Sequence, residues 1–318
     1  PLVNPDEINL RYDRIDYFLQ YPEQRENTRA VLKKIGDIER SVSRLSVGRG
    51  GPRDLYAVGY GLSLIPELRT QINGAMIPTA LMDDLYKLGN HSELTEEILH
   101  ALREPSTATD TDEGYNLPML VREGGFIRKG YHGELDRLMN LKDGKKRERA
   151  ILQQKYIAET GINNLKISYN KLVGFFIEVP LKQAEHLLAN PQAGFIHRQT
   201  LTNNVRFTTA ELINLETTVA HVDDEIARME EEIFNQLCNM LASQNKEIKE
   251  TCMAIARIDI ASASATGAEK YHWVRPVITT DTTFDIKGGR HPVVEKALMK
   301  NHQTFVPNDC NMNEGSNK

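Results

Sequence analysis

The feature that most constrains this chain is a series of apolar residues between positions 212 and 240, spaced alternately by three and four. Only an α-helix brings such residues onto one side, and four heptads of them predict a coiled-coil seam about 40 Å long. Gln236 is the only interruption. The seam consists of Leu212, Leu215, Val219, Val222, Ile226, Met229, Ile233 and Met240.

A partner for this helix is predicted at residues 134–159, which combine helical apolar spacing with many charges. Their net charge is +2, whereas residues 210–250 carry −7, so the two segments attract each other. A chain that runs out along one helix and back along the other must pair them antiparallel. Gly144 is a weak point in the first helix. Its apolar face is expected to contain Leu135, Leu138, Leu141, Leu152 and Tyr156.

Residues 164–209, between these two helices, have no helical period. Their β-branched and aromatic residues are broken at Asn170–Lys171 and Asn203–Asn204, which predicts short antiparallel strands with a polar connection after Val179. This segment has a net charge of +3 in a chain of −5. We therefore expect a small basic β module at the end of two helical arms, suited to gripping a polyanion backbone.

The first hundred residues follow helical spacing and predict a helical core. Asn4 and Pro5 form a strong helix start, because Asn is a good N-cap and Pro fits the first helical position. The other predicted segments are a polar loop at 104–116, an extended segment at 119–127, a helix rich in small residues at 253–271, and strands at 276–280, 283–286 and 304–306.

The composition argues against disulfide-rich, zinc-binding and membrane-spanning classes of protein. The three cysteines, Cys238, Cys252 and Cys310, lie far apart and form no Cys-x-x-Cys or Cys/His cluster. This pattern indicates a reducing compartment, with neither a disulfide framework nor a zinc site. No apolar run approaches the roughly 20 residues of a membrane span, so we expect no membrane partner.

The segment 198–206 carries the candidate DNA-binding residues. Guanidinium, amide and hydroxyl groups at a loop tip are the usual phosphate-contacting set. The alternative is an ordinary hairpin turn, with the Asn pair supplying positive φ and the arginines solvated. The candidates are Arg198, Gln199, Thr200, Asn203, Asn204 and Arg206.

Other motifs favour structural roles. Residues 48–54 are rich in Gly but lack the Gly-Lys-[Ser/Thr] ending of a phosphate loop, so we expect a turn between helices. Phe176 and Glu178 share one face of a predicted strand, which indicates sheet packing and a charge at the rim. His291 has no accompanying nucleophile pattern and is expected at a turn. We find no catalytic constellation.

Several stretches together resemble MutS-type DNA mismatch-repair ATPases, and in this order they cover nearly the whole chain. They are Asp37-Ile-Glu-Arg-Ser41, Gly48-Arg-Gly-Gly-Pro-Arg-Asp-Leu55, Arg122-Glu-Gly-Gly-Phe-Ile-Arg-Lys-Gly-Tyr131, Lys155-Tyr-Ile157 with Thr160-Gly-Ile162, Gly174-Phe-Phe-Ile-Glu-Val179, Arg198-Gln-Thr-Leu-Thr-Asn203 with Arg206-Phe207, and Gly289-Arg-His-Pro-Val-Val-Glu295.

The resemblance implies a mainly α fold: a helical core, two long antiparallel coiled-coil lever helices that carry a small antiparallel β clamp, and the incomplete β-containing start of an α/β ATPase domain. Residues 1–163 would form the core and the first lever, 164–209 the clamp, 210–272 the returning lever and core, and 273–318 the truncated ATPase segment.

The resemblance also implies partners. The six candidates from Arg198 to Arg206 would contact the backbone of duplex DNA, and Phe305 would match the aromatic residue that lies against adenine. The full-length protein would be a homodimeric, bacterial, cytosolic and nucleoid-associated ATPase that uses ATP and Mg. Its mismatch-reading domain would precede Pro1, and its Walker A loop would follow the tail at 313–318. Without that loop we expect no ATP hydrolysis by this chain and no bound cofactor.

Two other functions stay open. A coiled-coil scaffold could present the same β tip to a protein partner, and the salt dependence of DNA binding would separate it from a DNA clamp. A nucleotide hydrolase is the third alternative, and tight binding of ATP by this chain would favour it.

Overall fold

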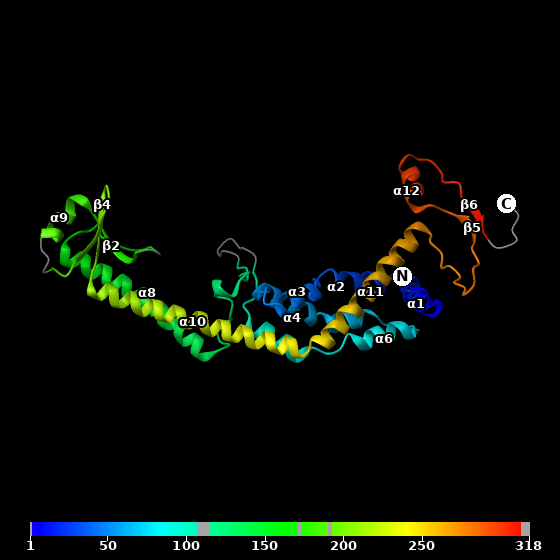
Figure 1. The fold of residues 1–318 in the computed structure, drawn as a ribbon, viewed down its shortest axis with the longest axis horizontal. Coiled ribbons are helices and arrows are strands. Elements are labelled where there is room, and N and C mark those ends of the chain that lie inside the picture. The colour runs from blue at the N-terminus through cyan, green and yellow to red at the C-terminus, as the bar shows by residue number, and fades with distance from the viewer. Residues whose placement is uncertain (1, 75, 107–114, 171–172, 190–192, 313–318) are drawn as a thin grey trace. The chain divides into compact units, whose positions relative to one another are not determined.

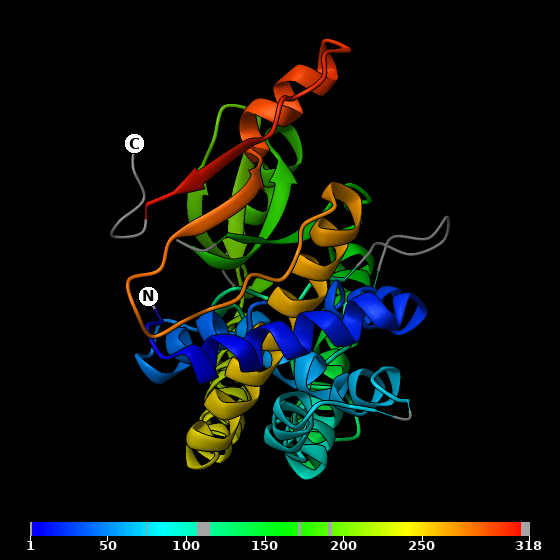
Figure 2. The ribbon, with the colours of Figure 1, turned by 90° about the vertical axis from the view of Figure 1, so that its right-hand side faces the viewer.

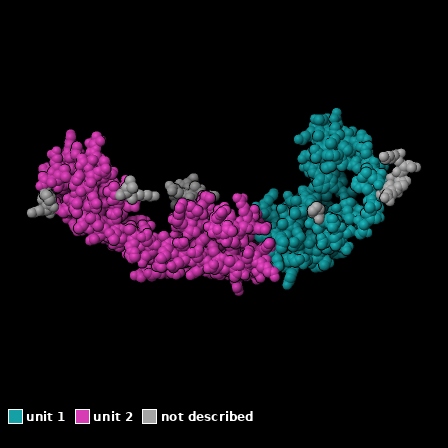
Figure 3. Space-filling view, viewed as in Figure 1, with its two compact units in different colours: residues 1–33, 67–89, 250–318 teal, residues 34–66, 90–249 magenta. Residues whose placement is uncertain are grey.

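The computed structural model describes residues 2–74, 76–106, 115–170, 173–189 and 193–312. These residues are mostly helical, with one four-stranded and one two-stranded antiparallel sheet (Figure 1). Much of the predicted polar loop, Lys171 and the tail at 313–318 lie outside the described residues. The chain divides into two compact units (Figure 3): residues 1–33, 67–89 and 250–318, and residues 34–66 and 90–249.

The first unit is built on α1, which begins as the sequence predicts. The side chain of Asn4 accepts a hydrogen bond of 2.9 Å from the amide of Asp6, and Pro5 opens the helix. In Figure 2, α1 crosses in front of α11. The helices and strands of this unit are α1 (Pro5–Gln20), α2 (Pro22–Leu32), α6 (Thr79–Lys87), most of α11 (Asn245–Tyr271), β5 (Asp285–Gly289), α12 (Pro292–Lys300) and β6 (Asn308–Asn311).

A buried carboxylate joins three helices of this unit. Asp84 of α6 has no exposed surface, and its two oxygens accept hydrogen bonds of 2.5 Å from Nε of Arg14 in α1 and Nε of Arg257 in α11. A buried charge is tolerated only with such partners, because it is otherwise far better solvated by water.

The second unit contains the two long predicted helices and the four-stranded sheet. Its helices are α3 (Ile38–Ser46), α4 (Pro52–Ser63), α7 (Ser92–Ala101), the 3-10 helix η1 (Val121–Glu123), α8 (Gly133–Thr160), α9 (Leu181–Ala189) and α10 (Ala210–Ser243). Helix α5 (Ile65–Gln71), like α11, contains residues of both units. The expected turn lies between α3 and α4, and residues 52–54 already open α4, where Asp54 accepts a hydrogen bond of 3.1 Å from the amide of Gly51.

Helices α8 and α10 pack against each other in opposite directions. Lys155 pairs with Glu211 at 2.6 Å and Lys142 with Asp223 at 2.7 Å. Residue numbers therefore increase along α8 in the direction in which they decrease along α10. Most of the predicted seam residues are buried, namely Leu212, Leu215, Val222, Ile226 and Ile233, while Val219 and Met229 are half-buried.

Two residues of the predicted apolar faces, Met240 of α10 and Leu141 of α8, differ from expectation. Met240 is 39% exposed, and Leu237 and Leu241 are buried in its place. Helix α10 contacts η1, α3 and α7 as well as α8. On α8, Leu141 is exposed.

Four other expectations about secondary structure need correction. The polar connection after Val179 contains α9, whose Ala184 and Leu187 are buried. The predicted extended segment at 119–127 contains η1, although Ile127 does bridge to Leu102. The predicted strands at 276–280 and 304–306 are not strands, and the pair that forms is β5 with β6. The helix break falls at Gln244 rather than near residue 250.

A second buried carboxylate fastens a loop to α10. Glu230 is 1% exposed and accepts hydrogen bonds from the backbone amides of Gly125 (2.8 Å) and Ile127 (3.3 Å). Phe126 between them packs edge-on against Phe234. The loop is thereby held by both its backbone and its side chain.

We predict that Asp84→Asn will lower the free energy of unfolding by about 3–5 kcal/mol, because the buried guanidinium of Arg14 and the half-buried one of Arg257 lose their counter-charge. The matched control is Asp83→Asn, whose ion pair with Lys87 is about half exposed and should cost less than about 1 kcal/mol. Urea unfolding followed by circular dichroism measures both. Equal losses would show that the buried network is not a determinant of stability.

We also predict that Glu230→Gln will destabilise the chain by about 1–3 kcal/mol, because the amide group presents an N–H where the loop needs an acceptor. Glu231→Gln, on the exposed side of the same helix turn, should change stability by less than about 0.5 kcal/mol. Amide hydrogen exchange at Gly125 and Ile127 should accelerate only in the first variant; unchanged exchange there would contradict this role.

Candidate nucleic-acid interface

The candidate interface is the four-stranded antiparallel sheet, with strand order β1-β2-β4-β3. Its strands are β1 (Lys166–Asn170), β2 (Gly174–Pro180), β3 (Ile196–Thr200) and β4 (Asn204–Thr208). The short antiparallel strands predicted from the sequence are therefore present, and β1 and β3 form the two edges.

One face of the sheet packs onto the adjoining ends of α8 and α10. Ile177 and Phe207, which are register partners, are fully buried there with Leu212 of α10. Tyr156 of α8 lies in the same cluster and shares a hydrogen bond of 2.6 Å with the hydroxyl of Thr209. Burial raises the pKa of the Tyr156 phenol to about 12, so this group stays neutral at physiological pH. This apolar cluster attaches the sheet to α8 and α10.

The opposite face carries a row of polar residues across all four strands. Lys166 pairs in register with Glu178, Glu178 with Arg206, and Arg206 with Gln199. Cross-strand neighbours of this kind interact directly. Positive and negative charges therefore alternate along the row, and its single carboxylate lies between two cations.

Arg206 is partly covered by its neighbours. Its guanidinium carbon lies 4.2 Å from the centroid of the Phe176 ring, and Nη1 donates a hydrogen bond of 3.1 Å to Oε1 of Gln199. Nε lies 3.9 Å from a carboxylate oxygen of Glu178, which also accepts a hydrogen bond of 3.2 Å from the side-chain amide nitrogen Nδ2 of Asn204. The Arg206 side chain is 19% exposed. Phe176 is buried, as predicted, but its role as a platform for Arg206 becomes visible only from the register.

Arg198 has different surroundings. Every residue of β3 is exposed, and the register between β3 and β4 shifts between His197 and Gln199, which places Arg198 at a bulge. Arg198 forms no ion pair with any other described residue. A bulge turns a side chain out of the regular alternation, so Arg198 is the most available cation of the candidate set.

The remaining candidates lie around the turn that joins β3 to β4. Thr200 is hydrogen-bonded to the ring of His197 at 2.9 Å, and the carbonyl of Asn203 accepts from the amide of Leu181 at 2.9 Å. Positive φ at the Asn pair is not observed: among the described residues other than glycine, only His272 and His302 have it. The turn closes instead through a hydrogen bond from the Leu201 amide to the Asn204 carbonyl.

Phe305, the candidate nucleotide-binding residue, lies in the other unit and outside any strand. The guanidinium of Arg290 stands 5.4 Å from the centroid of its ring, and Nε of Arg290 donates a hydrogen bond of 2.9 Å to Glu295. That bond lowers the pKa of the Glu295 carboxyl. His291 caps α12 by accepting from the Val294 amide at 3.3 Å, which agrees with the expected turn.

The MutS domain III family profile matches residues 1–265. The chain belongs to this family. It is 41% identical to the DNA mismatch repair protein MutS of Bartonella tribocorum (strain CIP 105476 / IBS 506), over 100% of this chain and 34% of that protein. It is 37% identical to MutS of Paracoccus denitrificans (strain Pd 1222), over 99% of the chain and 35% of that protein.

The MutS of Rhizobium meliloti (strain 1021) is 36% identical over 98% of the chain. The chain thus spans about a third of the length of the MutS relatives it matches. The family resemblance inferred from the motifs is confirmed. In the described part of this MutS domain III chain, no helix is long and apolar enough to cross a bilayer.

For this sheet we predict that Glu178→Gln will strengthen binding of duplex DNA at low salt, because it removes the only carboxylate from the polar row while keeping an acceptor for Asn204. We expect a gain of up to about fivefold, which corresponds to roughly 1 kcal/mol, and fluorescence anisotropy measures it. Glu185→Gln, an exposed acid on α9, is the control. Equal gains in both variants would assign the effect to net charge.

Proposed function

We propose that this chain serves DNA mismatch repair as the part of a MutS protein that embraces duplex DNA through its phosphate backbone. The observation that best supports this proposal is the exposed edge strand β3, on which Arg198 has no ion-pair partner among the described residues. Gln199 and Thr200 follow it on the same strand, and Asn203 is exposed in the adjoining turn. A guanidinium with neighbouring amides and hydroxyls suits phosphate oxygens at any DNA sequence.

In this proposal Arg206 and Arg198 have different tasks. Arg206 is held over Phe176 and orients Gln199, so it adds positive potential and keeps the neighbouring amide in place. Arg198 makes the direct contact. Asn204 is engaged by Glu178 through its side chain, so it contributes to the shape of the turn as well as to phosphate binding.

We propose further that α8 and α10 act as antiparallel coiled-coil levers. Their paired length, the buried positions of the seam and the two ion pairs between them support this role. Residues 164–209 would then be the clamp, with 1–163 and 210–272 as levers and core and 273–318 as the start of an ATPase domain. In the full-length protein, two such clamps in a homodimer would close on DNA from both sides.

ATP and Mg would belong to that full-length protein. The residues of this chain fit only one part of such a site: Phe305 offers an aromatic ring, whereas the sequence contains no Gly-x-x-x-x-Gly-Lys-[Ser/Thr] loop to hold phosphates and metal. We therefore assign no step of nucleotide hydrolysis to these residues.

The test is a salt titration of DNA binding by the chain. Each phosphate contact contributes roughly 0.9 to the slope of log K against log salt, so Arg198→Ala with Arg206→Ala should flatten the slope by up to about 2. The matched control replaces Arg137 and Arg228, two exposed arginines of α8 and α10 outside the sheet. An unchanged slope in the sheet variant, or a preference for an acidic protein surface over duplex DNA, would favour the scaffold alternative.

A further inference from the structure

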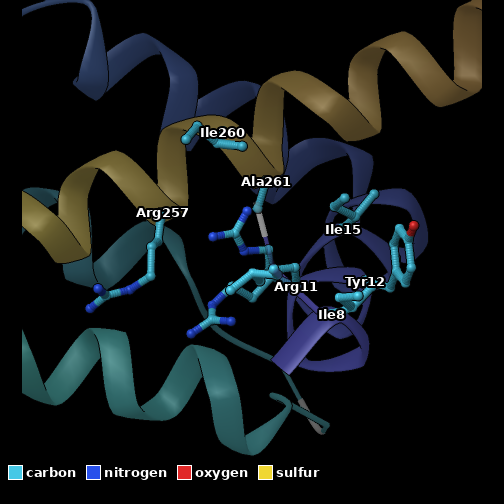
Figure 4. A pocket seen from close by; sticks show the side chains of 9 residues that line it. Ile8, Arg11, Tyr12, Ile15, Arg257, Ile260 and Ala261 are labelled. Carbon is cyan, nitrogen blue, oxygen red and sulfur yellow. The ribbon is translucent and has the colours of Figure 1, made fainter. Parts of the chain in front are cut away.

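A pocket of about 360 Å³ lies between α1 and α11 in the first unit. Figure 4 shows that it has two chemically distinct sides: the guanidinium groups of Arg11 and Arg257 extend to one side, and Ile15 and Tyr12 stand on the other. Such a volume matches the lower end of the range for ligand sites in proteins. The pocket is separate from the β sheet proposed to contact DNA.

The apolar side is only partly covered. Ile8 and Ile15 of α1 are half-buried, and Ile260 of α11 is 63% exposed. Met253, which is 44% exposed, lies seven positions before Ile260 and therefore on the same face of α11. The apolar surface thus continues along α11 beyond the pocket itself, so it extends past the reach of a small molecule seated there.

The polar side has unused hydrogen-bond donors. Both oxygens of Asp84 are taken by Arg14 and Arg257, yet Nη2 of Arg257 is buried without any hydrogen-bond partner. Arg11 is exposed and forms no ion pair with another residue in the described part of the chain. Three guanidinium groups, those of Arg11, Arg14 and Arg257, line the pocket, and the carboxylate of Asp84 pairs with two of them, Arg14 and Arg257. A buried unsatisfied donor is costly, so the guanidinium of Arg257 lacks one acceptor on this side of the pocket.

We propose that this pocket binds a peptide segment in which an apolar side chain stands next to an acidic one. The apolar side chain would fill the space between Ile8, Ile15 and Ile260, and the carboxylate would pair with the exposed guanidinium of Arg11. A nucleic-acid backbone offers the charge but would leave the isoleucines uncovered, so it matches only half of the site. The inference stands apart from the proposed grip on DNA.

The experiment pans a random phage-displayed peptide library against the whole chain, with counter-selection against Arg11→Gln combined with Ile260→Asn. Both residues are exposed, so the variant should fold. We expect peptides enriched in an acidic residue beside Leu, Ile or Phe. No enrichment, or enrichment without an acidic residue, would overturn the proposal.

The enriched peptide is then measured by fluorescence anisotropy. Arg11→Gln and Ile260→Asn should each weaken binding about tenfold, as expected for one charge-assisted contact or one buried side chain. Lys33→Gln and Tyr86→Asn, an exposed cation and an exposed aromatic residue elsewhere in the unit, should leave it unchanged. The double variant at Arg198 and Arg206 should also bind normally, which separates this result from the DNA proposal.

Two further outcomes would overturn the assignment. Displacement of the peptide by excess duplex DNA would show that the guanidinium groups take phosphate. Binding of 4-phenylbutanoate as tightly as the peptide would assign the pocket to small acids instead.

Discussion

The arrangement of the second unit depends on the apolar cluster in which one face of the four-stranded sheet meets the ends of α8 and α10. Ile177, Val205 and Phe207 contribute fully buried side chains from the strands, and Leu212 contributes one from α10. Burial of each such side chain is worth about 1.5–3 kcal/mol, whereas the exposed ion pairs between α8 and α10 contribute at most about 1 kcal/mol each. Apolar burial therefore fixes the sheet on the helices, and charge complementarity only favours their pairing.

One face of the sheet packs in this cluster, so polar side chains must lie on the other face. Because side chains alternate along a strand, every second residue is placed on that polar face. Glu178 and Arg206 are brought together by that period and by the register. The sheet thus contains one arginine held by an aromatic ring and a carboxylate, and a second arginine at an irregular position of the edge. The two arginines are alike in the sequence and unlike in their surroundings.

Much of this fold could be predicted from the sequence, because the helical and strand periods extend over many residues. The seam through Leu212, Val222 and Ile233 is an example. Prediction failed where a local pattern was short or where distant contacts decided. Helix α9 has only nine residues, and its stability comes from burial of Ala184 and Leu187. Met240 fits the heptad, but a straight helix drifts by roughly 20° per heptad, and Leu237 and Leu241 are buried instead on a helix that also contacts α3 and α7.

The candidate site also has a part that the sequence predicts and a part that only the strand pairing reveals. The chemical types at Arg198, Gln199 and Asn203 could be identified from the sequence because they cluster near a turn. The covering of Arg206 by Phe176 could not, because it joins residues thirty positions apart through the pairing of β2 with β4.

The bulge at Arg198 has a consequence for association between molecules. A regular, fully exposed edge strand is a template for another strand, and such pairing leads to edge-to-edge aggregation. Strand β3 is exposed along its whole length, but the shifted register interrupts its row of backbone donors and acceptors and puts a charge at the interruption. The same irregularity that frees a guanidinium therefore also discourages a foreign strand from extending the sheet.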